Sequence, residues 1–205
     1  MSQPGKIVCV GRNYPAHVRE MGNELPKEPV IFFKPVSSLI GPGEPIVLPP
    51  ESIQVEHEAE IAVVIGRRLR RGSAGDAERA IRGFTCANDV TARDLQKKDA
   101  QWGRAKGFDS FCPVGPGVAE GLDWRDLEVV GRVNGVERQR GRSSDMIFSI
   151  PDLLVYISAA MTLEPGDLVL TGSPAGTGPL RAGDVVEVEI GGVGVLSNPV
   201  RAEAA

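Results

Sequence analysis

The chain has few cysteines, few aromatic residues and only two histidines among its 205 residues. The cysteines, Cys9, Cys86 and Cys112, are far apart and form no Cys-x-x-Cys pair, which excludes a cysteine zinc site and a disulfide framework. Scattered thiols of odd number are typical of a reducing compartment, so we expect a cytoplasmic protein. No apolar run has the length of a membrane span, and residues 7–11 are too short for a signal peptide, so no membrane partner is expected.

The chain also lacks a large excess of one charge sign. Its 23 basic and 27 acidic residues are interspersed, and the net charge is −4. Without a basic patch, and with only 2 Trp, 2 Tyr and 6 Phe to stack on bases, nucleic acid is not an expected partner. The composition, 41% hydrophobic and 24% charged, is that of an ordinary globular protein. The length and the lack of a linker predict a single domain over residues 1–205.

The abundant residues are glycine (25) and proline (16), which divide the chain into many short segments and favour a β-rich fold. We expect strands over residues 7–11, 30–34, 45–48, 54–65 and 83–89, and a hairpin that starts over 126–134 and turns at Asn134-Gly135. A short helix or an ordered loop is expected over 13–21, short helices over 76–82 and 91–98, and an amphipathic helix over 150–161. Two similar units follow, each a Gly-Asp turn that leads into a strand, beginning at Glu164 and Arg181.

The predicted strand over residues 54–65 carries three carboxylates. Side chains alternate along a strand, so Glu56, Glu58 and Glu60 share one face with Ala62 and Val64. That face begins charged and ends apolar, and a buried carboxylate is costly without a partner. A divalent cation such as Mg²⁺, Mn²⁺ or Ca²⁺ would stabilise such a group. The alternative is a hydrated strand edge that faces solvent.

The two histidines lie in different settings. His57 points to the opposite face of the carboxylate strand, and we expect it to be structural. His17 shares a face with Glu20 if its segment is helical. A carboxylate beside an imidazole fixes its tautomer and raises its basicity, as a general base needs. The alternative for His17 is a surface residue of a polar helix.

Two further segments carry polar side chains. Asp89 ends a predicted strand just before a helix, where it could be a ligand or an N-cap. Donors to an anionic substrate, or alternatively hydrated surface groups, are Arg93, Gln96 and Lys106. Residues 171–178 lack the Gly-Lys-Ser/Thr ending of a phosphate loop, but backbone N–H groups and Thr171 could line a site there. No dinucleotide fingerprint or Gly-x-Ser-x-Gly elbow occurs.

Several stretches together carry a family resemblance. They are Cys9-Val-Gly-Arg-Asn-Tyr14, His57-Glu-Ala-Glu60, Asn88-Asp-Val-Thr-Ala-Arg-Asp-Leu-Gln96, Leu170-Thr-Gly-Ser-Pro-Ala-Gly-Thr-Gly178, and residues 17–20, 33–35, 61–66, 105–108, 133–135 and 146–151. These stretches follow the family's order along the chain, which resembles the catalytic domain of the fumarylacetoacetate hydrolase family, in its single-domain, acylpyruvase-like branch of acylpyruvate hydrolases and oxaloacetate decarboxylases. The resemblance implies an α+β fold, a β-rich mixed β-sandwich or roll of the family's C-terminal-domain type with few short helices. It also implies a homodimer.

The resemblance further implies the residues of the site. Mg²⁺ or Mn²⁺ would bind to Glu58, Glu60 and Asp89, which leaves Glu56 outside the ligand set. The implied catalytic residues are His17 and Glu20, as a dyad on a lid-like segment, and Lys106. The implied substrate-binding residues are Arg12, Tyr14, Lys34, Gln96 and Thr171. Ala175 stands where relatives often have a larger polar residue, which leaves the acyl-end specificity open.

The implied activity is that of a metal-dependent hydrolase that acts on ketonic substances. It would cleave a C–C bond of a 2,4-dioxo acid, of acylpyruvate or fumarylpyruvate type, to pyruvate and a carboxylic acid, with His17 activating the water. One alternative is a decarboxylase of oxaloacetate or another 2-oxo acid, and another is an isomerase or hydratase of the 2-oxo dioates of aromatic catabolism. A binding protein without catalysis is the alternative from another class. The lack of an additional N-terminal domain argues against fumarylacetoacetate itself.

Overall fold

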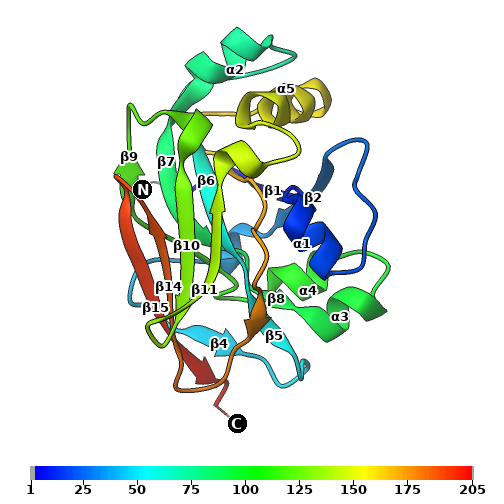
Figure 1. Ribbon diagram of the computed structural model, residues 1–205, viewed down its shortest axis with the longest axis vertical. Helices are drawn as coiled ribbons and strands as arrows, with labels where there is room; N and C mark the ends of the chain where they lie inside the picture. Colours follow the sequence, from blue (N-terminus) through cyan, green and yellow to red (C-terminus); the bar gives the residue numbers. More distant parts are fainter. Residues whose placement is uncertain (1–2, 205) are drawn as a thin grey trace.

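Three β-sheets form the frame of the protein (Figure 1). The structure is a computed structural model, and it describes residues 3–204. The seven-stranded sheet has, in spatial order, β2 (Val30–Lys34), β1 (Ile7–Gly11), β12 (Leu168–Leu170), β6 (Ala59–Ile65), β7 (Ile81–Asn88), β9 (Cys112–Ala119) and β3 (Leu39–Ile40). The five-stranded sheet has β11 (Val136–Arg142), β10 (Glu128–Val133), β14 (Val185–Ile190), β15 (Gly194–Ala202) and β4 (Ile46–Leu48). The three-stranded sheet has β13 (Gly178–Pro179), β5 (Val55–His57) and β8 (Thr91–Ala92).

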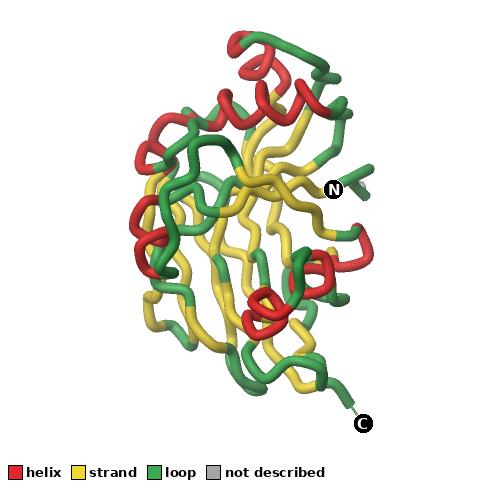
Figure 2. Tube along the Cα trace, turned by 90° about the vertical axis from the view of Figure 1, so that its right-hand side faces the viewer, coloured by secondary structure: helices red, strands yellow, loops and turns green. Residues whose placement is uncertain are grey.

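The helices are short and lie around the outside of the strands (Figure 2). Those of the described residues are α1 (Pro15–Glu20), α2 (Ala74–Ala80), α3 (Arg93–Lys98), α4 (Gly103–Gly107) and α5 (Ile150–Ala160), with single 3₁₀ turns at Val36–Ser38, Trp124–Asp126 and Ser143–Asp145. In Figure 1, α2 and α5 lie together at the top, and α1, α3 and α4 gather at one side. Many strands with few short helices confirm the predicted β-rich α+β fold. None of the described helices is both long and apolar enough to cross a bilayer.

The sequence of α5 accounts for its helical structure. Ser149 caps its N-terminus, where the side chain accepts a hydrogen bond from the backbone N–H of Asp152, and Pro151 occupies the first turn. The helix buries one apolar face, which includes Leu153, Leu154 and Ile157. The helix predicted over residues 150–161 is therefore confirmed.

Alternation along the central strands places the side chains of their two faces in two different clusters of the core. Val8, Ile61 and Val63 belong to a cluster that includes residues of α2, α5 and the five-stranded sheet. Ala62 and Val64 point to the opposite face and belong to a second cluster with Ile7, Cys9, Leu168 and Leu170. Glu60 lies on this second face by the same alternation. The predicted change from charged to apolar side chains along one strand face is therefore confirmed from Glu60 to Val64.

The prediction of one continuous strand over residues 54–65 is wrong. The strand is interrupted at Glu58, so β5 and β6 belong to different sheets. The cause is a hydrogen bond to a side chain. The Glu58 backbone N–H donates to Asn88 Oδ1 at 3.0 Å, where a continuous strand would pair with a backbone carbonyl. The predicted helix over 91–98 is also shorter, since Thr91 pairs with Glu56 and the helix starts at Arg93.

The packing of α5 gives a test of the fold. Leu154 has no exposed surface in the main cluster, whereas Leu25 is 55% exposed. Leu154→Ala should lower the free energy of unfolding by about 2–5 kcal/mol, because it removes buried apolar surface and leaves a cavity. Leu25→Ala, the same change at an exposed position, should alter it by no more than about 0.5 kcal/mol. Urea unfolding measures both, and equal effects would contradict this packing.

Candidate active site

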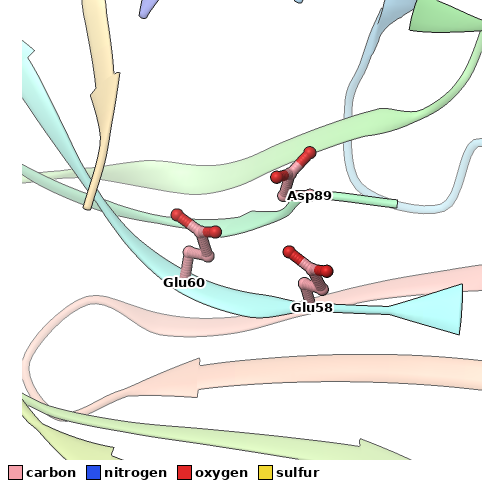
Figure 3. Close-up of side chains that lie close together, drawn as sticks. All are labelled: Glu58, Glu60 and Asp89. Atoms are coloured by element: carbon pink, nitrogen blue, oxygen red, sulfur yellow. The ribbon is translucent and has the colours of Figure 1, made fainter. Parts of the chain in front are cut away.

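Three carboxylates from separate positions converge beside the seven-stranded sheet. Glu58 lies at the break between β5 and β6, Glu60 lies in β6, and Asp89 follows β7. One oxygen from each lies within 4.8 Å of the others (Figure 3). The antiparallel pairing of β6 with β7 brings them together, because Ala59 is opposite Asn88 and Glu60 is opposite Ala87. All three are buried.

Basic side chains compensate two of these carboxylates. Arg93 Nη2 donates to Glu58 Oε1 at 2.6 Å, and Lys106 Nζ donates to Glu58 Oε2 at 3.0 Å. Asp89 accepts from Lys34 Nζ at 2.7 Å and from Lys106 Nζ at 2.5 Å. Although burial favours the neutral form, the charges of Lys106 and Arg93 hold the pKa of Glu58 below its usual range.

The third carboxylate, Glu60, lacks such a partner. No basic group within residues 3–204 lies at salt-bridge distance from it, and it accepts one hydrogen bond, from the backbone N–H of Gly172 at 2.7 Å. Burial and the neighbouring carboxylates of Asp89 and Glu58 raise the pKa of Glu60 well above its usual range. A cation beside Glu60 would favour its ionised form. Three convergent carboxylates offer the hard oxygen ligands that Mg²⁺ and Mn²⁺ prefer, so these residues fit a divalent cation.

The charge of the surrounding cluster also favours a divalent cation. Its buried members are Glu56, Glu58, Glu60 and Asp89 on one side and Lys34, Arg93 and Lys106 on the other. With all of them ionised the cluster has one excess negative charge, and a divalent cation would change this to one positive charge. Glu56 is directed elsewhere, since it accepts from Arg93 Nε at 2.8 Å and from Gln54 Nε2 at 2.6 Å.

A cavity of about 250 Å³ opens beside this cluster. Glu58, Lys106 and Arg93 of the cluster are among the residues that line it. The other polar and aromatic residues that line it are Arg12, His17, Asn23, Phe32, Gln96, Lys97 and Trp102. Because most of the charged lining is basic, the cavity suits a small anion.

His17 and Glu20 form the expected pair on α1. His17 Nδ1 lies 3.1 Å from Glu20 Oε2, and the His17 side chain is 10% exposed. Glu20 also accepts the backbone N–H of Gly176, at 3.0 and 3.1 Å to its two oxygens. Glu20 therefore orients the imidazole and ties α1 to the loop between β12 and β13. No other described residue is hydrogen-bonded to the His17 side chain, so Nε2 has no partner among them.

The remaining predicted substrate residues divide into two groups. Arg12 and Gln96 line the cavity, where the Arg12 guanidinium carbon lies 5.9 Å from the Trp102 ring centroid and Gln96 Oε1 accepts from Arg93 Nη1 at 2.8 Å. Lys34 is not among the residues that line the cavity, and it donates to Asp89 and to the carbonyl of Val90.

Thr171 and Tyr14 are not among the residues that line this cavity. The Thr171 hydroxyl donates to the carbonyl of Ile61 at 2.9 Å, so it fastens the loop to β6. Tyr14 lines a separate cavity with Pro174 and Ala175. Its hydroxyl is the one buried side-chain polar atom without a hydrogen-bond partner in the described part of the chain. Substrate contact by these two residues stays a prediction.

Asn13 is a site residue that sequence reasoning missed, whereas the Gly172 N–H is one of the backbone groups that residues 171–178 were expected to offer. Asn13 Nδ2 donates to the carbonyl of Thr171 at 2.9 Å, which joins the segment before α1 to the loop after β12. Gly172 has a φ of +101°, and a Cβ there would lie 2.8 Å from Asn13 Cβ. A side chain at 172 would therefore displace the N–H group that serves Glu60.

Comparison with known proteins places this site in a family. Residues 6–201 match the family described as fumarylacetoacetate (FAA) hydrolase, C-terminal. The chain belongs to the fumarylacetoacetate hydrolase family. A protein from Pyrococcus abyssi is 52% identical over 98% of this chain and 92% of its own length. A mitochondrial oxaloacetate tautomerase from Bos taurus is 43% identical over 98% of this chain and 68% of its own length.

Solved structures of the fumarylacetoacetate hydrolase family share the fold. A 5-carboxymethyl-2-hydroxymuconate delta-isomerase from Mycobacterium smegmatis has a TM-score of 0.93 and 48% identity, over 99% of this chain and 81% of the other. A 2-hydroxyhepta-2,4-diene-1,7-dioate isomerase from Mycobacterium marinum has a TM-score of 0.92 and 47% identity, over 99% of this chain and 77% of the other. The predicted family and fold are thus confirmed, and the family is one of enzymes.

Metal binding tests the carboxylate cluster directly. Calorimetric titration of metal-stripped protein with Mn²⁺ should show one site, and Mg²⁺ should compete for it. Glu60→Gln should weaken Mn²⁺ binding at least about tenfold, because it removes a charged oxygen ligand. The control is Glu56→Gln, which should weaken Mn²⁺ binding less than Glu60→Gln does, because Glu56 bonds to Arg93 and its loss removes a charge but no ligand. Equal losses in both variants would show that general charge, and not this cluster, determines binding.

Proposed function

We propose that the chain is a divalent-metal-dependent enzyme, with Mg²⁺ or Mn²⁺, that interconverts the keto and enol forms of a small 2-oxo dicarboxylic acid. One observation supports this above all. Glu58, one of the three clustered buried carboxylates, lines a cavity whose other charged residues are basic and whose lining includes His17. A cation site and a proton-transfer group thus face one small anion site.

The basic side chains account for substrate binding and for stabilisation of charge. Arg12, Arg93 and Lys97 line the cavity with donors for the carboxylates of the substrate. Lys106, buried beside Glu58, provides positive charge where negative charge develops on the 2-oxo oxygen. A bound divalent cation would supply Lewis acidity at the same oxygen.

His17 is the proposed proton-transfer group. Its Nε2 removes a proton from the carbon next to the 2-oxo group, and the electron pair of that C–H bond forms the C=C bond as charge moves to the oxygen. Return of a proton to the oxygen completes the enol, and the reverse steps give the keto form. Glu20 holds Nδ1 and stabilises the imidazolium while His17 carries the proton.

The names of the relatives support this order of preference. The bovine relative is an oxaloacetate tautomerase, and the two structural neighbours are isomerases of dioate substrates. Tautomerases and isomerases move protons next to an activated carbonyl group, which the arrangement of His17 and Lys106 would serve in this chain as well.

Hydrolytic C–C cleavage of a 2,4-dioxo acid is the second candidate. The observation that favours it is the His17–Glu20 pair, which has the arrangement of a base that activates water. Oxaloacetate, an acylpyruvate and a dienedioate should be assayed with wild-type protein, with enol, pyruvate and CO₂ measured separately. We expect enol–keto exchange to be fastest. Faster release of pyruvate from the acylpyruvate would instead identify a hydrolase, CO₂ a decarboxylase, and no turnover a binding protein.

His17→Ala should slow the enol–keto exchange of oxaloacetate by about 10²–10⁴-fold, the usual contribution of a positioned acid or base. Metal affinity should stay near the wild-type value, because His17 is not among the clustered carboxylates. The rate is followed by ultraviolet absorbance and the affinity by calorimetry. A variant that binds metal normally and keeps the wild-type rate would exclude His17 as the proton-transfer group.

A further inference from the structure

Gln139 reaches from one sheet to the other. It lies in β11 of the five-stranded sheet, and its side chain is buried against β6 of the seven-stranded sheet. Its strand neighbour in β10 is Gly131, where a Cβ would lie 2.8 Å from Ala59 Cβ and 3.3 Å from Gln139 Cβ. The absence of a side chain at 131 therefore provides the space through which the amide of Gln139 crosses between the sheets.

The amide of Gln139 uses its full hydrogen-bonding capacity. Its Oε1 accepts from the Ala59 backbone N–H at 2.9 Å and from His57 Nδ1 at 2.8 Å. Its Nε2 donates to Ser173 Oγ at 2.6 Å and to the Pro174 carbonyl at 2.7 Å. The opposite orientation of the amide would set its N–H groups against the N–H of Ala59, so the arrangement is unique and places a proton on His57 Nδ1.

These bonds close a ring around the metal-ligand segment. Ser173 Oγ donates in turn to the Ala59 carbonyl at 3.1 Å, so Gln139, Ser173 and Ala59 are joined in a cycle. Ala59 is the residue between Glu58 and Glu60, and Ser173 follows Gly172, whose N–H group bonds to Glu60. The ring thus connects the segment of Glu58 and Glu60 to the loop whose Gly172 N–H bonds to Glu60.

We propose that Gln139 is a positioning residue for the metal centre, one that holds the segment from Glu58 to Glu60 at a fixed separation from the loop at Gly172. The inference rests on the metal centre proposed above. Gln139 carries no charge and contacts none of the three carboxylates, so it acts on the placement of the ligands and not on their ionisation. Without its amide, the N–H groups of Ala59 and His57 lose their acceptor, and Glu58 and Glu60 lose their common support.

Gln139→Met tests the proposal, because methionine has a similar length but cannot make the four hydrogen bonds. Calorimetric titration of metal-stripped protein with Mn²⁺ should give a dissociation constant about 10–100 times that of the wild type, the usual effect of losing a group that orients metal ligands. In the same metal-free protein, hydrogen exchange at the Gly172 amide should be faster, because the loop has lost its anchor.

The matched control is Asn198→Leu, which removes another buried amide from the five-stranded sheet. Asn198 Nδ2 donates to the carbonyls of Gly41 and Glu44, both at 2.8 Å, and bonds to no residue of the metal centre. This variant should melt at a lower temperature, as Gln139→Met does, but bind Mn²⁺ with wild-type affinity. If Gln139→Met also binds Mn²⁺ as the wild type does, Gln139 is only structural and the proposal is overturned.

Ser173→Ala provides a milder test if the methionine variant does not fold. It opens the ring but leaves Gln139 bonded to Ala59 and His57, and it should weaken Mn²⁺ binding in the same direction by a smaller factor. Wild-type affinity in Ser173→Ala would then overturn the proposal. A failure of the metal centre itself is distinguishable, because the wild-type protein would show no Mn²⁺ binding in the same titration.

Discussion

The mutual repulsion of three buried carboxylates is the constraint on which this structure depends. Unit charges about 5 Å apart repel by about 3 kcal/mol at an effective dielectric constant of about 20, and burial adds the cost of lost hydration. Lys34, Lys106 and Arg93 offset this repulsion at Glu58 and Asp89. Within residues 3–204, Glu60 is bonded only to the backbone N–H group of Gly172. The cluster is therefore most stable with a further cation beside Glu60, and the sheets hold the ligands close in spite of their repulsion.

This charge arrangement connects the fold with the proposed chemistry. A cluster with one excess negative charge attracts a divalent cation, and with that cation it becomes a site for an anion. The cavity continues this pattern, since Arg12 and Lys97 add positive charge to its lining. A 2-oxo acid presents a carboxylate and a carbonyl oxygen that becomes negative on enolisation. Both groups would be stabilised by the same field, whereas a neutral ketone would gain much less.

Local sequence patterns predicted the parts of the structure that local forces determine. The strands over residues 7–11 and 30–34 and the capped helix at 150 follow from apolar periodicity and turn residues. Period-two alternation placed Glu60 on the face of Ala62. The break at Glu58 was not predictable, because its cause is the side chain of Asn88, 30 residues away. The same limit applies to Gln139, which bonds to Ala59 across 80 residues and between two sheets. The roles of Asp89 and Lys106 were implied by family resemblance, and the structure now brings their side chains together.

The central claim is that Glu58, Glu60 and Asp89 form one divalent-cation site. Anomalous diffraction from crystals soaked in Mn²⁺ tests it most directly, because the anomalous signal locates the ion without reference to any assumed ligand. We predict a single strong peak in contact with a carboxylate oxygen of each of the three residues, with Lys106 and Lys34 remaining beside Glu58 and Asp89. A peak at other residues, or no peak at a Mn²⁺ concentration that saturates binding in solution, would contradict the account.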